Sequence, residues 1–415
     1  MTELVVVGIS HRTAGIELRE RLALSPGHAT SMLGELVAQG PIREALALST
    51  CGRTELYALA SDAGAAEAAL LRVLARRAGR EPEALVAEAK IARGFDALEH
   101  LFRVAAGLES MVLGEVEILG QLRRARGLAT TVGAGAHSMC RLVDRALVAG
   151  RLAREQTGIA AGRASVSSIA VGLACRFLGD GGGHALVIGS GDTGAKTARA
   201  LRMAGMDVTI VAARRSVRAA ALAAEVGGRV VPVGGLRESL EVADVVVSCT
   251  ASPHHLVPLE LLVDVMARRP ERGLLLLDLA MPRDVDPAAR GLEGVQLHDL
   301  DDLTRTAEAT ANGRAAAAPD AAALVTAEAE LCARWMAGLG MVTTIKRLRR
   351  KTHDAVLEGL RRSELSVGVD ERQLRAVSEA IVSRLLHHPT LQLKAAAALG
   401  EGEDLAASVG QLFEL

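Results

Sequence analysis

The sequence is poor in aromatic residues, since its 415 residues include four Phe, one Tyr and one Trp. A protein that binds nucleic acid by stacking bases on aromatic side chains is therefore not expected. Lysine and arginine number 48 and aspartate and glutamate 49, so the net charge is −1. This balance predicts no general attraction to nucleic acid or to an anionic membrane. Half of the residues are hydrophobic, which predicts a folded chain, and its length predicts two to four domains.

Cysteines and long apolar runs are also scarce. The cysteines are odd in number and none has the CxxC spacing, which argues against a disulfide framework and against a metal site. No uncharged stretch reaches the ~18 apolar residues that a membrane helix needs. The first ten residues lack the basic and long apolar segments of a signal peptide, so we expect a cytoplasmic protein without membrane contact. The five cysteines are Cys51, Cys140, Cys175, Cys249 and Cys332.

Apolar patterns divide the chain into three predicted parts. Residues 1–155 mix strands with helices, as in an α+β domain, and are read as helical from about residue 63. Residues 156–300 alternate short Val/Leu/Ile strands with helices, which predicts a parallel, Rossmann-like sheet. Residues 301–415 are Ala-rich and helical, so the fold class is a multidomain α/β and α+β protein. Strands are expected at residues 4–9, 45–49, 55–60, 185–188, 208–211, 245–249 and 274–278.

The C-terminal part is predicted to contain a long linking helix followed by further helices. Pro319 is expected at most to kink that helix. Apolar positions recur among Lys and Arg, and a helical tail of this kind usually needs a partner surface. We therefore expect a homodimer, with a monomeric helical cap as the alternative. The apolar positions are Ile345, Leu348, Val356, Leu357 and Leu360.

Residues 189–194 read GSGDTG, between a predicted strand and a predicted helix. In that context the first glycine makes a tight turn, the second admits a pyrophosphate, the third packs the helix on the sheet, and the helix N-terminus holds phosphates. Two arginines after the next strand favour NADPH over NADH, because arginine suits a 2′-phosphate. The alternative for the glycine loop is a tight turn that binds no ligand. The alternative for the two arginines is a solvated pair on a loop. The predicted cofactor contacts are Gly189, Ser190, Gly191, Asp192, Thr193, Gly194, Arg214 and Arg215.

Cys51 lies in the polar segment STCGRTE, residues 49–55, between two predicted strands. The neighbouring Arg53 would favour the thiolate and hence a nucleophile, whereas a thiol that packs at a strand end is the alternative. Residues 107–121, GLESMVLGEVEILGQ, place carboxylates, a hydroxyl and an amide on an apolar helical pattern. This stretch suits a substrate with amino and carboxyl groups. The nearby His100 is ambiguous, because a lone histidine is more often a surface or paired residue than an acid or base.

Taken together, the motifs resemble the glutamyl-tRNA reductase family over essentially the whole chain. The matching motifs occur in family order. They are GISHRTA at residues 8–14, the segment around Cys51 at residues 49–55, residues 107–121, the GSGDTG loop and DLAMPRDVDP at residues 278–287. The resemblance implies NADPH-dependent reduction of glutamyl-tRNA(Glu) to glutamate 1-semialdehyde, the first step of five-carbon tetrapyrrole biosynthesis. It also implies a catalytic N-terminal domain, an NADP-binding Rossmann-like domain and a helical dimerisation domain.

The resemblance further implies roles for individual residues. Cys51 would attack the ester carbonyl between glutamate and tRNA and form a thioester, and His100 falls on a histidine important for activity. Arg53 would anchor the glutamyl carboxylate through charge-assisted hydrogen bonds. The implied substrate contacts are Thr50, Gly52, Arg53, Ser110, Glu115, Val116, Glu117, Gln121 and Ser165.

Some positions depart from the family pattern. Gly52 stands where Asn is usual, and Val116 and Glu117 replace a Pro-Gln pair. Two rival interpretations are a shikimate dehydrogenase-like oxidoreductase, which forms no thioester, and a dimeric NADP-binding scaffold without catalysis. The reactive product implies handover to glutamate 1-semialdehyde aminotransferase. The tRNA would be recognised by shape, phosphate contacts and the glutamyl group.

Overall fold

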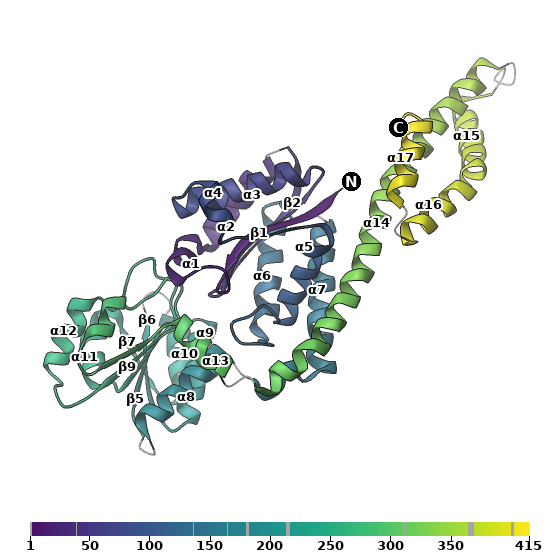
Figure 1. The fold of residues 1–415 in the computed structure, drawn as a ribbon. Coiled ribbons are helices and arrows are strands. Elements are labelled where there is room, and N and C mark those ends of the chain that lie inside the picture. Colours follow the sequence, from purple (N-terminus) through teal and green to yellow (C-terminus); the bar gives the residue numbers. More distant parts are fainter. Residues whose placement is uncertain are drawn as a thin grey trace. The chain divides into compact units, whose positions relative to one another are not determined.

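The structure is a computed structural model that describes residues 2–38, 40–135, 137–163, 165–179, 182–212, 216–309, 312–363, 369–399 and 402–415. Its contacts divide the chain into a larger unit, Glu3–Val325, and a smaller unit that comprises Thr326–Leu415 with the first two residues. Figure 1 shows the helices and strands of both units. Among the described residues, no helix is apolar enough over a sufficient length to cross a membrane.

An antiparallel sheet in the order β2-β3-β1-β4 forms the first part of the larger unit. Its two central strands are buried over almost their whole length, because helices and loops cover both faces of the sheet. The last strand is a short edge strand in a region predicted to be helical, so that prediction was wrong there. The strands are β1 (Glu3–Ser10), β2 (Ile42–Ser49), β3 (Arg53–Ala60) and β4 (Lys90–Arg93).

Helices pack on this sheet through their apolar faces. Among them are helices that contact β2 and helices that contact β1, and the longest also packs along another helix. The buried Phe102 and Tyr57 lie in this core. The helices are α1 (Ile16–Leu22), α2 (Pro26–Ala38), α3 (Ala63–Ala78), α4 (Pro82–Val86), α5 (Gly94–Ala106), α6 (Glu117–Thr131), α7 (His137–Gln156) and the 3-10 helix η1 (Gly158–Arg163).

A second, fully parallel sheet follows in the order β7-β6-β5-β8-β9-β10. This is the doubly wound order of dinucleotide-binding folds, in which the chain changes direction across the sheet between β5 and β8. The four central strands confirm the sequence prediction, whereas the two edge strands were missed. The strands are β5 (His184–Ile188), β6 (Asp207–Ala212), β7 (Arg229–Pro232), β8 (Val245–Ser248), β9 (Leu274–Asp278) and β10 (Val295–His298).

Alternate residues of the parallel strands point to opposite faces, and each face has its own apolar core. Val187 and Val247 belong to a core with α8 (Val166–Leu178), α9 (Asp192–Met203), α10 (Ser216–Val226) and α13 (Leu300–Ala309). Leu186 and Val246 belong to a core with α11 (Leu236–Val242), α12 (Leu259–Ala267) and η3 (Pro287–Gly291). The first core also takes in Ile16, Met111 and Val112, so the two sheets of the larger unit share packed side chains. A further 3-10 helix is η2 (Val233–Gly235).

The smaller unit is helical. The 51-residue helix α14 (Asn312–Arg362) runs through Pro319 without interruption, and α15 (Glu371–Leu385), α16 (His387–Leu399) and α17 (Gly402–Leu412) follow it. Ile345 and Leu348 pack against residues of α15 and α16, so they form the core of this unit.

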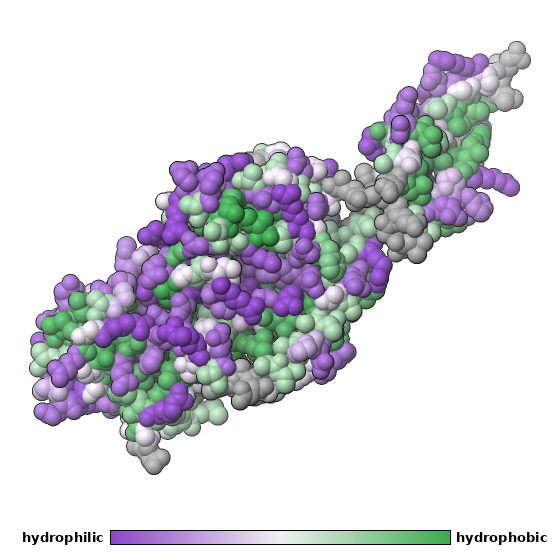
Figure 2. All heavy atoms as spheres, viewed as in Figure 1, coloured by the Kyte–Doolittle hydropathy of each residue, from purple (hydrophilic) through white to green (hydrophobic). Residues whose placement is uncertain are grey.

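A separate row of apolar residues on α15 lies exposed. Val377, Ile381 and Leu385 are 46%, 37% and 61% exposed and recur every four residues along one face of the helix. Figure 2 shows apolar side chains at the surface of this unit. The apolar positions that were expected to face a partner, such as Ile345 and Leu348, are instead buried within the chain.

Candidate active site

Cys51 lies in the tight turn between β2 and β3. The amide of Thr50 donates to the carbonyl of Arg53 at 2.8 Å, and the Thr50 hydroxyl accepts from the amide of Gly52 at 3.2 Å. The amide of His11 donates to the Gly52 carbonyl at 2.8 Å, which ties β1 to the same turn. These bonds hold Cys51 in one backbone conformation at the end of a buried sheet.

The guanidinium of Arg53 does not lie beside the thiol, and that prediction was wrong. Arg53 is 3% exposed, and its Nη1 donates to Glu55 Oε1 at 2.8 Å while its Nη2 donates to the carbonyl of Glu109. His100 Nε2 lies 3.0 Å from the same Glu55 Oε1, and Tyr57 donates to Glu55 Oε2 at 2.6 Å. Although burial alone would raise it, the pKa of Glu55 is held well below its usual range, chiefly by Arg53 and His100.

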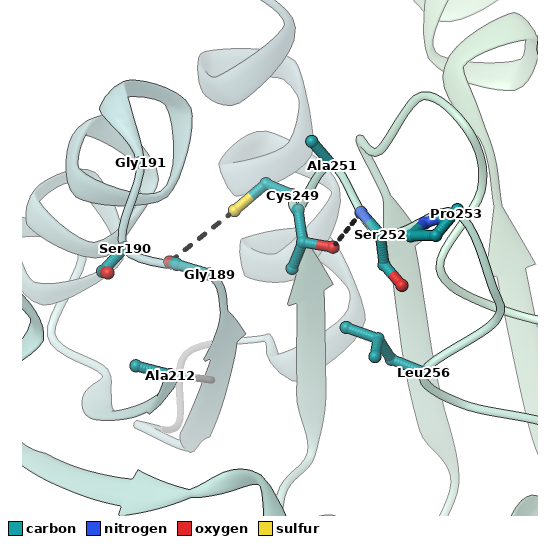
Figure 3. Close-up of a pocket in the computed structure, with 10 residues that line it drawn as sticks. Gly189, Ser190, Gly191, Ala212, Cys249, Ala251, Ser252, Pro253 and Leu256 are labelled. Atoms are coloured by element: carbon teal, nitrogen blue, oxygen red, sulfur yellow. Dashed lines mark hydrogen bonds between the residues drawn. The ribbon is translucent and has the colours of Figure 1, made fainter. Parts of the chain in front are cut away.

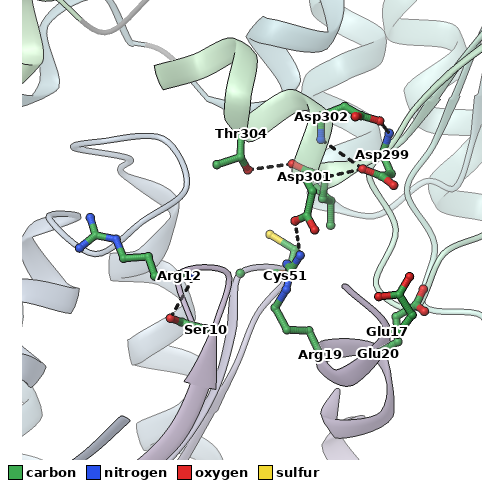
Figure 4. Close-up of polar contacts among 12 residues, drawn as sticks. Ser10, Arg12, Glu17, Arg19, Glu20, Cys51, Asp299, Asp301, Asp302 and Thr304 are labelled. Carbon is green, nitrogen blue, oxygen red and sulfur yellow. Dashed lines mark hydrogen bonds and ion pairs between the residues drawn. The ribbon is translucent and has the colours of Figure 1, made fainter. Parts of the chain in front are cut away.

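A different arginine contacts the cysteine turn. Arg19 Nη1 donates to the Cys51 carbonyl at 3.1 Å, and Arg19 also pairs with Asp301 (Figure 4). Burial, the largest cause, and the carboxylates of Glu115 and Glu117 together raise the pKa of the Cys51 thiol to about 12 against the opposing charge of Arg19. Cys51 is therefore a neutral thiol here, and the expectation that a neighbouring cation favours the thiolate is not met. A nucleophilic role requires a base that accepts the thiol proton.

The predicted site residues fall into two cavities. One, of about 490 Å³, is lined by Thr50, Cys51, Glu115, Glu117 and Gln121 together with residues of the parallel-sheet part. The other, of about 480 Å³, is lined by Arg53 and His100 with polar neighbours such as Glu109. The structure thus brings the thiol and the residues 115–121 together, and it places Arg53 and His100 in a separate polar network.

The other predicted substrate contacts lie around these cavities without lining them. Ser110 follows α5 in a bend, Val116 is the exposed N-cap of α6, and Ser165 caps α8 through a reciprocal bond with Ser168. A Cβ at Gly52 would lie 3.3 Å from Met111 Cγ and 3.7 Å from His11 Nδ1. A larger residue at position 52 would therefore fill the space beside these two side chains.

The segment that precedes α6 is held by Arg154 of α7. Its guanidinium donates to the carbonyls of Ala105 and Gly114 at 2.9 and 3.3 Å, and also to that of Glu115. Gly114 has φ +78°, and a Cβ there would lie 1.9 Å from the Ile159 carbonyl oxygen, so only glycine fits. Arg154 and Gly114 together fix the position of Glu115 beside the thiol cavity.

The GSGDTG loop connects β5 to α9 at the switch point of the parallel sheet. A cavity of about 550 Å³ lies there, lined by Gly189, Ser190 and Gly191 on one side and by residues 249–253 after β8 on the other (Figure 3). In doubly wound folds this crevice at the carboxyl ends of the strands is where nucleotides bind. The cavity therefore has the position and the walls of a dinucleotide site.

The three glycines differ in what surrounds them. Gly189 has φ +113°, and a Cβ at Gly194 would lie 2.2 Å from the Gly189 carbonyl oxygen, so the third glycine lets the helix approach the strand end. A Cβ at Gly191 would meet nothing within 4 Å, which leaves its backbone open toward the cavity. This spacing suits a pyrophosphate at the N-terminus of α9.

The remaining predicted cofactor contacts are placed as follows. Thr193 lines the thiol cavity, and Asp192 is exposed with an ion pair to Arg124 at 3.4 Å. Arg214 and Arg215 lie outside the described residues, so the structure describes no contact of theirs.

Ion pairs and apolar packing join the two sheets of the larger unit around the thiol cavity. Arg283 donates to both carboxylate oxygens of Glu20 at 2.8 and 2.9 Å, and its amide adds a third bond at 2.7 Å. Lys196 of α9 pairs with Glu117 at the start of α6. Thr193 and Thr250 therefore border the same cavity as Cys51.

Three residues at the site were missed by sequence reasoning. Arg19 contacts the cysteine turn through a pairing that is distant in sequence. Cys249, at the end of β8, borders both the nucleotide cavity and the thiol cavity, and burial together with Asp284 and Asp278 raises its pKa to about 12. The buried Nδ1 of His11 has no hydrogen-bond partner among the described residues, and burial and nearby arginines lower the pKa of His11 to about 4. The GISHRTA motif was the only signal that marked His11.

The geometry defines a class of protein: a two-part oxidoreductase in which a cysteine turn and a dinucleotide-binding sheet face one cavity. Comparisons with known proteins identify the family. Residues 7–157 match the model "Glutamyl-tRNAGlu reductase, N-terminal domain", residues 176–306 match "Shikimate / quinate 5-dehydrogenase", and residues 320–415 match "Glutamyl-tRNAGlu reductase, dimerisation domain".

Relatives match over the whole chain. The chain is 38% identical to glutamyl-tRNA reductase of Sorangium cellulosum, with 99% of this chain and 82% of the relative covered. It is also 38% identical to that of Salinispora arenicola, with 100% and 92% covered. The solved structure of glutamyl-tRNA reductase from Methanopyrus kandleri matches with a TM-score of 0.56 and 29% identity, covering 100% of both chains. The chain belongs to the glutamyl-tRNA reductase family.

Proposed function

We propose that this protein reduces glutamyl-tRNA(Glu) to glutamate 1-semialdehyde with NADPH, through a thioester on Cys51. The observation that carries the proposal is that Cys51 and the end of the GSGDTG loop border one cavity in a member of this family. The shikimate dehydrogenase-like alternative is disfavoured, because the parts on either side of that domain match glutamyl-tRNA reductases.

The proposed chemistry begins at the Cys51 sulfur. The sulfur forms a bond to the glutamyl carbonyl carbon, the bond from that carbon to the tRNA 3′ oxygen breaks, and the thiol proton ends on the departing tRNA. NADPH, when bound, supplies the hydride that reduces the thioester carbonyl; the carbon–sulfur bond breaks to give the semialdehyde, and the Cys51 sulfur takes up a proton. The fixed turn holds the sulfur at the cavity wall, so the reacting groups need only small movements to meet.

Binding of NADPH is supported by the shape of the nucleotide cavity. Gly191 leaves room for a pyrophosphate, and the amides at the start of α9 can donate to its oxygens. The preference for NADPH over NADH rests on Arg214 and Arg215 as a sequence pattern. In this proposal Thr50, Glu115, Glu117 and Gln121 face the glutamyl end of the substrate, while Arg53 and His100 act through the network around Glu55.

The exposed row on α15 supports a homodimer. Val377, Ile381 and Leu385 offer an apolar helix face, and the region that contains them matches a dimerisation domain. We expect Ile381→Glu to shift the mass measured by light scattering from dimer to monomer. Glu379→Gln, on the same helix, is the matched control and should remain dimeric.

The central experiment mixes the purified protein with glutamyl-tRNA and NADPH and measures semialdehyde. We expect semialdehyde with charged tRNA and none with uncharged tRNA plus free glutamate; equal yields from both would contradict the proposal. We place the reaction in the cytoplasm, where charged tRNA is formed. Handover of the product to glutamate 1-semialdehyde aminotransferase is part of the same proposal, and pull-down of the purified aminotransferase by this protein tests it.

A further inference from the structure

Two carboxyl groups lie next to each other at the wall of the Cys51 cavity. Glu115 precedes α6 and is 8% exposed, and Glu117 is the first residue of that helix. Both line the cavity with Cys51, and the charge of Glu117 acts on the carboxyl group of Glu115. Two neighbouring carboxylates disfavour each other's ionisation, so Glu115 keeps its proton to a higher pH than an isolated glutamate does.

The surroundings of Glu115 explain why the proton is retained. Burial, the largest cause, and the neighbouring Glu117 together raise the pKa of Glu115 to about 7 against the opposing charges of Lys196 and Arg154. Lys196 of α9 pairs with Glu117, and Arg154 of α7 donates to backbone carbonyls, including that of Glu115. The Cys51 thiol faces Glu115 and Glu117 from the β2–β3 turn, and both carboxylates raise the pKa of this thiol.

Other proton acceptors at this cavity already have partners. The carboxylate of Glu20 is bound by Arg283, and His28 Nδ1 lies 3.1 Å from the Ser25 hydroxyl. His100 lies in the other cavity, where its Nε2 contacts Glu55. His11, whose Nδ1 has no partner among the described residues, does not line this cavity. Of the groups that line it, the Glu115–Glu117 pair is left as the acid–base group for a thiol that must lose its proton.

We propose that the Glu115–Glu117 pair accepts the proton of the Cys51 thiol and returns it to the 3′ oxygen of the departing tRNA. This proposal rests on the proposed function, and it specifies the path of the proton in the thioester-forming step. The sulfur–carbon bond forms as the S–H proton moves to the ionised carboxylate of the pair; the carbon–oxygen ester bond then breaks as the pair gives that proton to the oxygen. No other reactant is required, and the pair ends in its starting state.

The test uses two amide variants and two readouts. One readout is the release of uncharged tRNA in a single turnover with glutamyl-tRNA in the absence of NADPH. The other is the rate at which iodoacetamide alkylates Cys51, followed by mass spectrometry of its peptide, which needs no tRNA. For Glu115→Gln we expect release to slow about 100-fold or more. Alkylation at pH 8 should become several-fold faster, because a negative charge beside the thiol is lost.

Glu117→Gln separates proton transfer from substrate binding. Without its carboxylate neighbour, Glu115 should ionise at a lower pH. The pH at which the release rate increases should therefore fall from near pH 7 by about one pH unit. The readout for this variant is therefore the pH at which the release rate rises, and not the maximal rate. Glu67→Gln, on α3 and paired with Arg93 at the surface, is the control and should change neither readout.

Several outcomes would overturn the proton path. One is a tRNA release rate in Glu115→Gln within threefold of that of the unchanged protein, and another is an unmoved pH profile in Glu117→Gln. A third is a change confined to KM, which would assign the pair to substrate binding. Slower release together with slower alkylation would show a displaced turn. Release that persists in Cys51→Ser would instead overturn the proposed function, so the two failures are distinct. If Glu115→Gln does not fold, the pH profile of Glu117→Gln decides.

Discussion

Glu55 and Glu115 are two buried glutamates in the same part of the chain, and their ionisation differs. Glu55 lies at a cavity of about 480 Å³ and is surrounded by Arg53, His100 and Tyr57. Glu115 lies at a cavity of about 490 Å³ and has another carboxyl group as its neighbour. Burial acts in the same direction on both, so the neighbours account for the opposite shifts of their pKa values.

The difference shows which of the two cavities contains a side chain that can transfer protons. Glu55 stays ionised at any ordinary pH, so it serves as the fixed partner of a buried guanidinium and a histidine. Glu115 gains and loses a proton near neutral pH, which is the property of a group that exchanges protons during a reaction. The thiol faces the second cavity, and the four predictions below test this division.

The largest expected effect is on the thiol itself. Cys51→Ser should lower semialdehyde formation at least ~1000-fold, because a hydroxyl is a much weaker nucleophile than a thiol in the same position. NADPH binding, measured by fluorescence titration, should be unchanged, since Cys51 does not line the nucleotide cavity. Full activity in this variant would exclude a thioester on Cys51.

The second effect is on stability and concerns Glu55. Glu55→Gln leaves the guanidinium of Arg53 buried without its counter-charge, so the free energy of unfolding should fall by about 3–5 kcal/mol. Glu67→Gln breaks an exposed pair with Arg93 and should cost less than ~1 kcal/mol. Urea unfolding of both variants measures the difference, and equal costs would refute the structural role of Glu55.

The third effect compares two glycines of the cofactor loop. Gly191→Ala adds a methyl group that meets no protein atom, so it should leave stability unchanged and weaken NADPH binding about tenfold by occupying the space expected for the pyrophosphate. Gly194→Ala should lower both stability and affinity, because its Cβ would lie 2.2 Å from the Gly189 carbonyl oxygen. Thermal unfolding and cofactor titration test the pair; unchanged NADPH affinity in Gly191→Ala would place the pyrophosphate elsewhere.

The smallest effect is a change in how stability depends on pH. The pKa of Glu115 is raised from 4.5 to about 7 on folding, so its contribution to stability is complete below about pH 4.5 and is lost as the pH rises to about 7. The pKa of Glu55 is lowered, so its contribution is lost in acid instead. Glu117→Gln should reduce the loss of stability between pH 5 and pH 8 by about 1 kcal/mol. Urea unfolding at the two pH values measures it, and a loss as large as in the unchanged protein would show that the carboxyl groups do not interact.

Much of the parallel-sheet part could be predicted from the sequence. Its four central strands are continuous apolar runs, and the GSGDTG loop lies between a strand and a helix, so each feature is contained in a short segment. The edge strands β7 and β10 were missed because they are only partly buried, so their residues do not form a continuous apolar run as those of the equally short β8 do. The edge strand β4 was missed for the same reason, inside a region dominated by helices.

The thiol site could be predicted less well. Cys51 and residues 115–121 were identified, but the cation expected beside the thiol was the wrong arginine. Arg53 begins a strand, and its guanidinium binds Glu55 and the carbonyl of Glu109, 56 residues away. Arg19 contacts Cys51 across 32 residues, a pairing that no local pattern indicates.

The sequence by itself determined the Rossmann-like parallel sheet, the helical C-terminal region, the glycine loop and the cysteine turn, because each depends on backbone conformation and apolar periodicity within a short segment. Only the tertiary structure decided that Cys51 is a neutral thiol, that Arg53 and His100 belong to the network of Glu55, and that Glu115 beside Glu117 has a raised pKa. The physical reason is that burial and the charges of neighbours set ionisation, and those neighbours come from strands and helices that meet only in the folded chain.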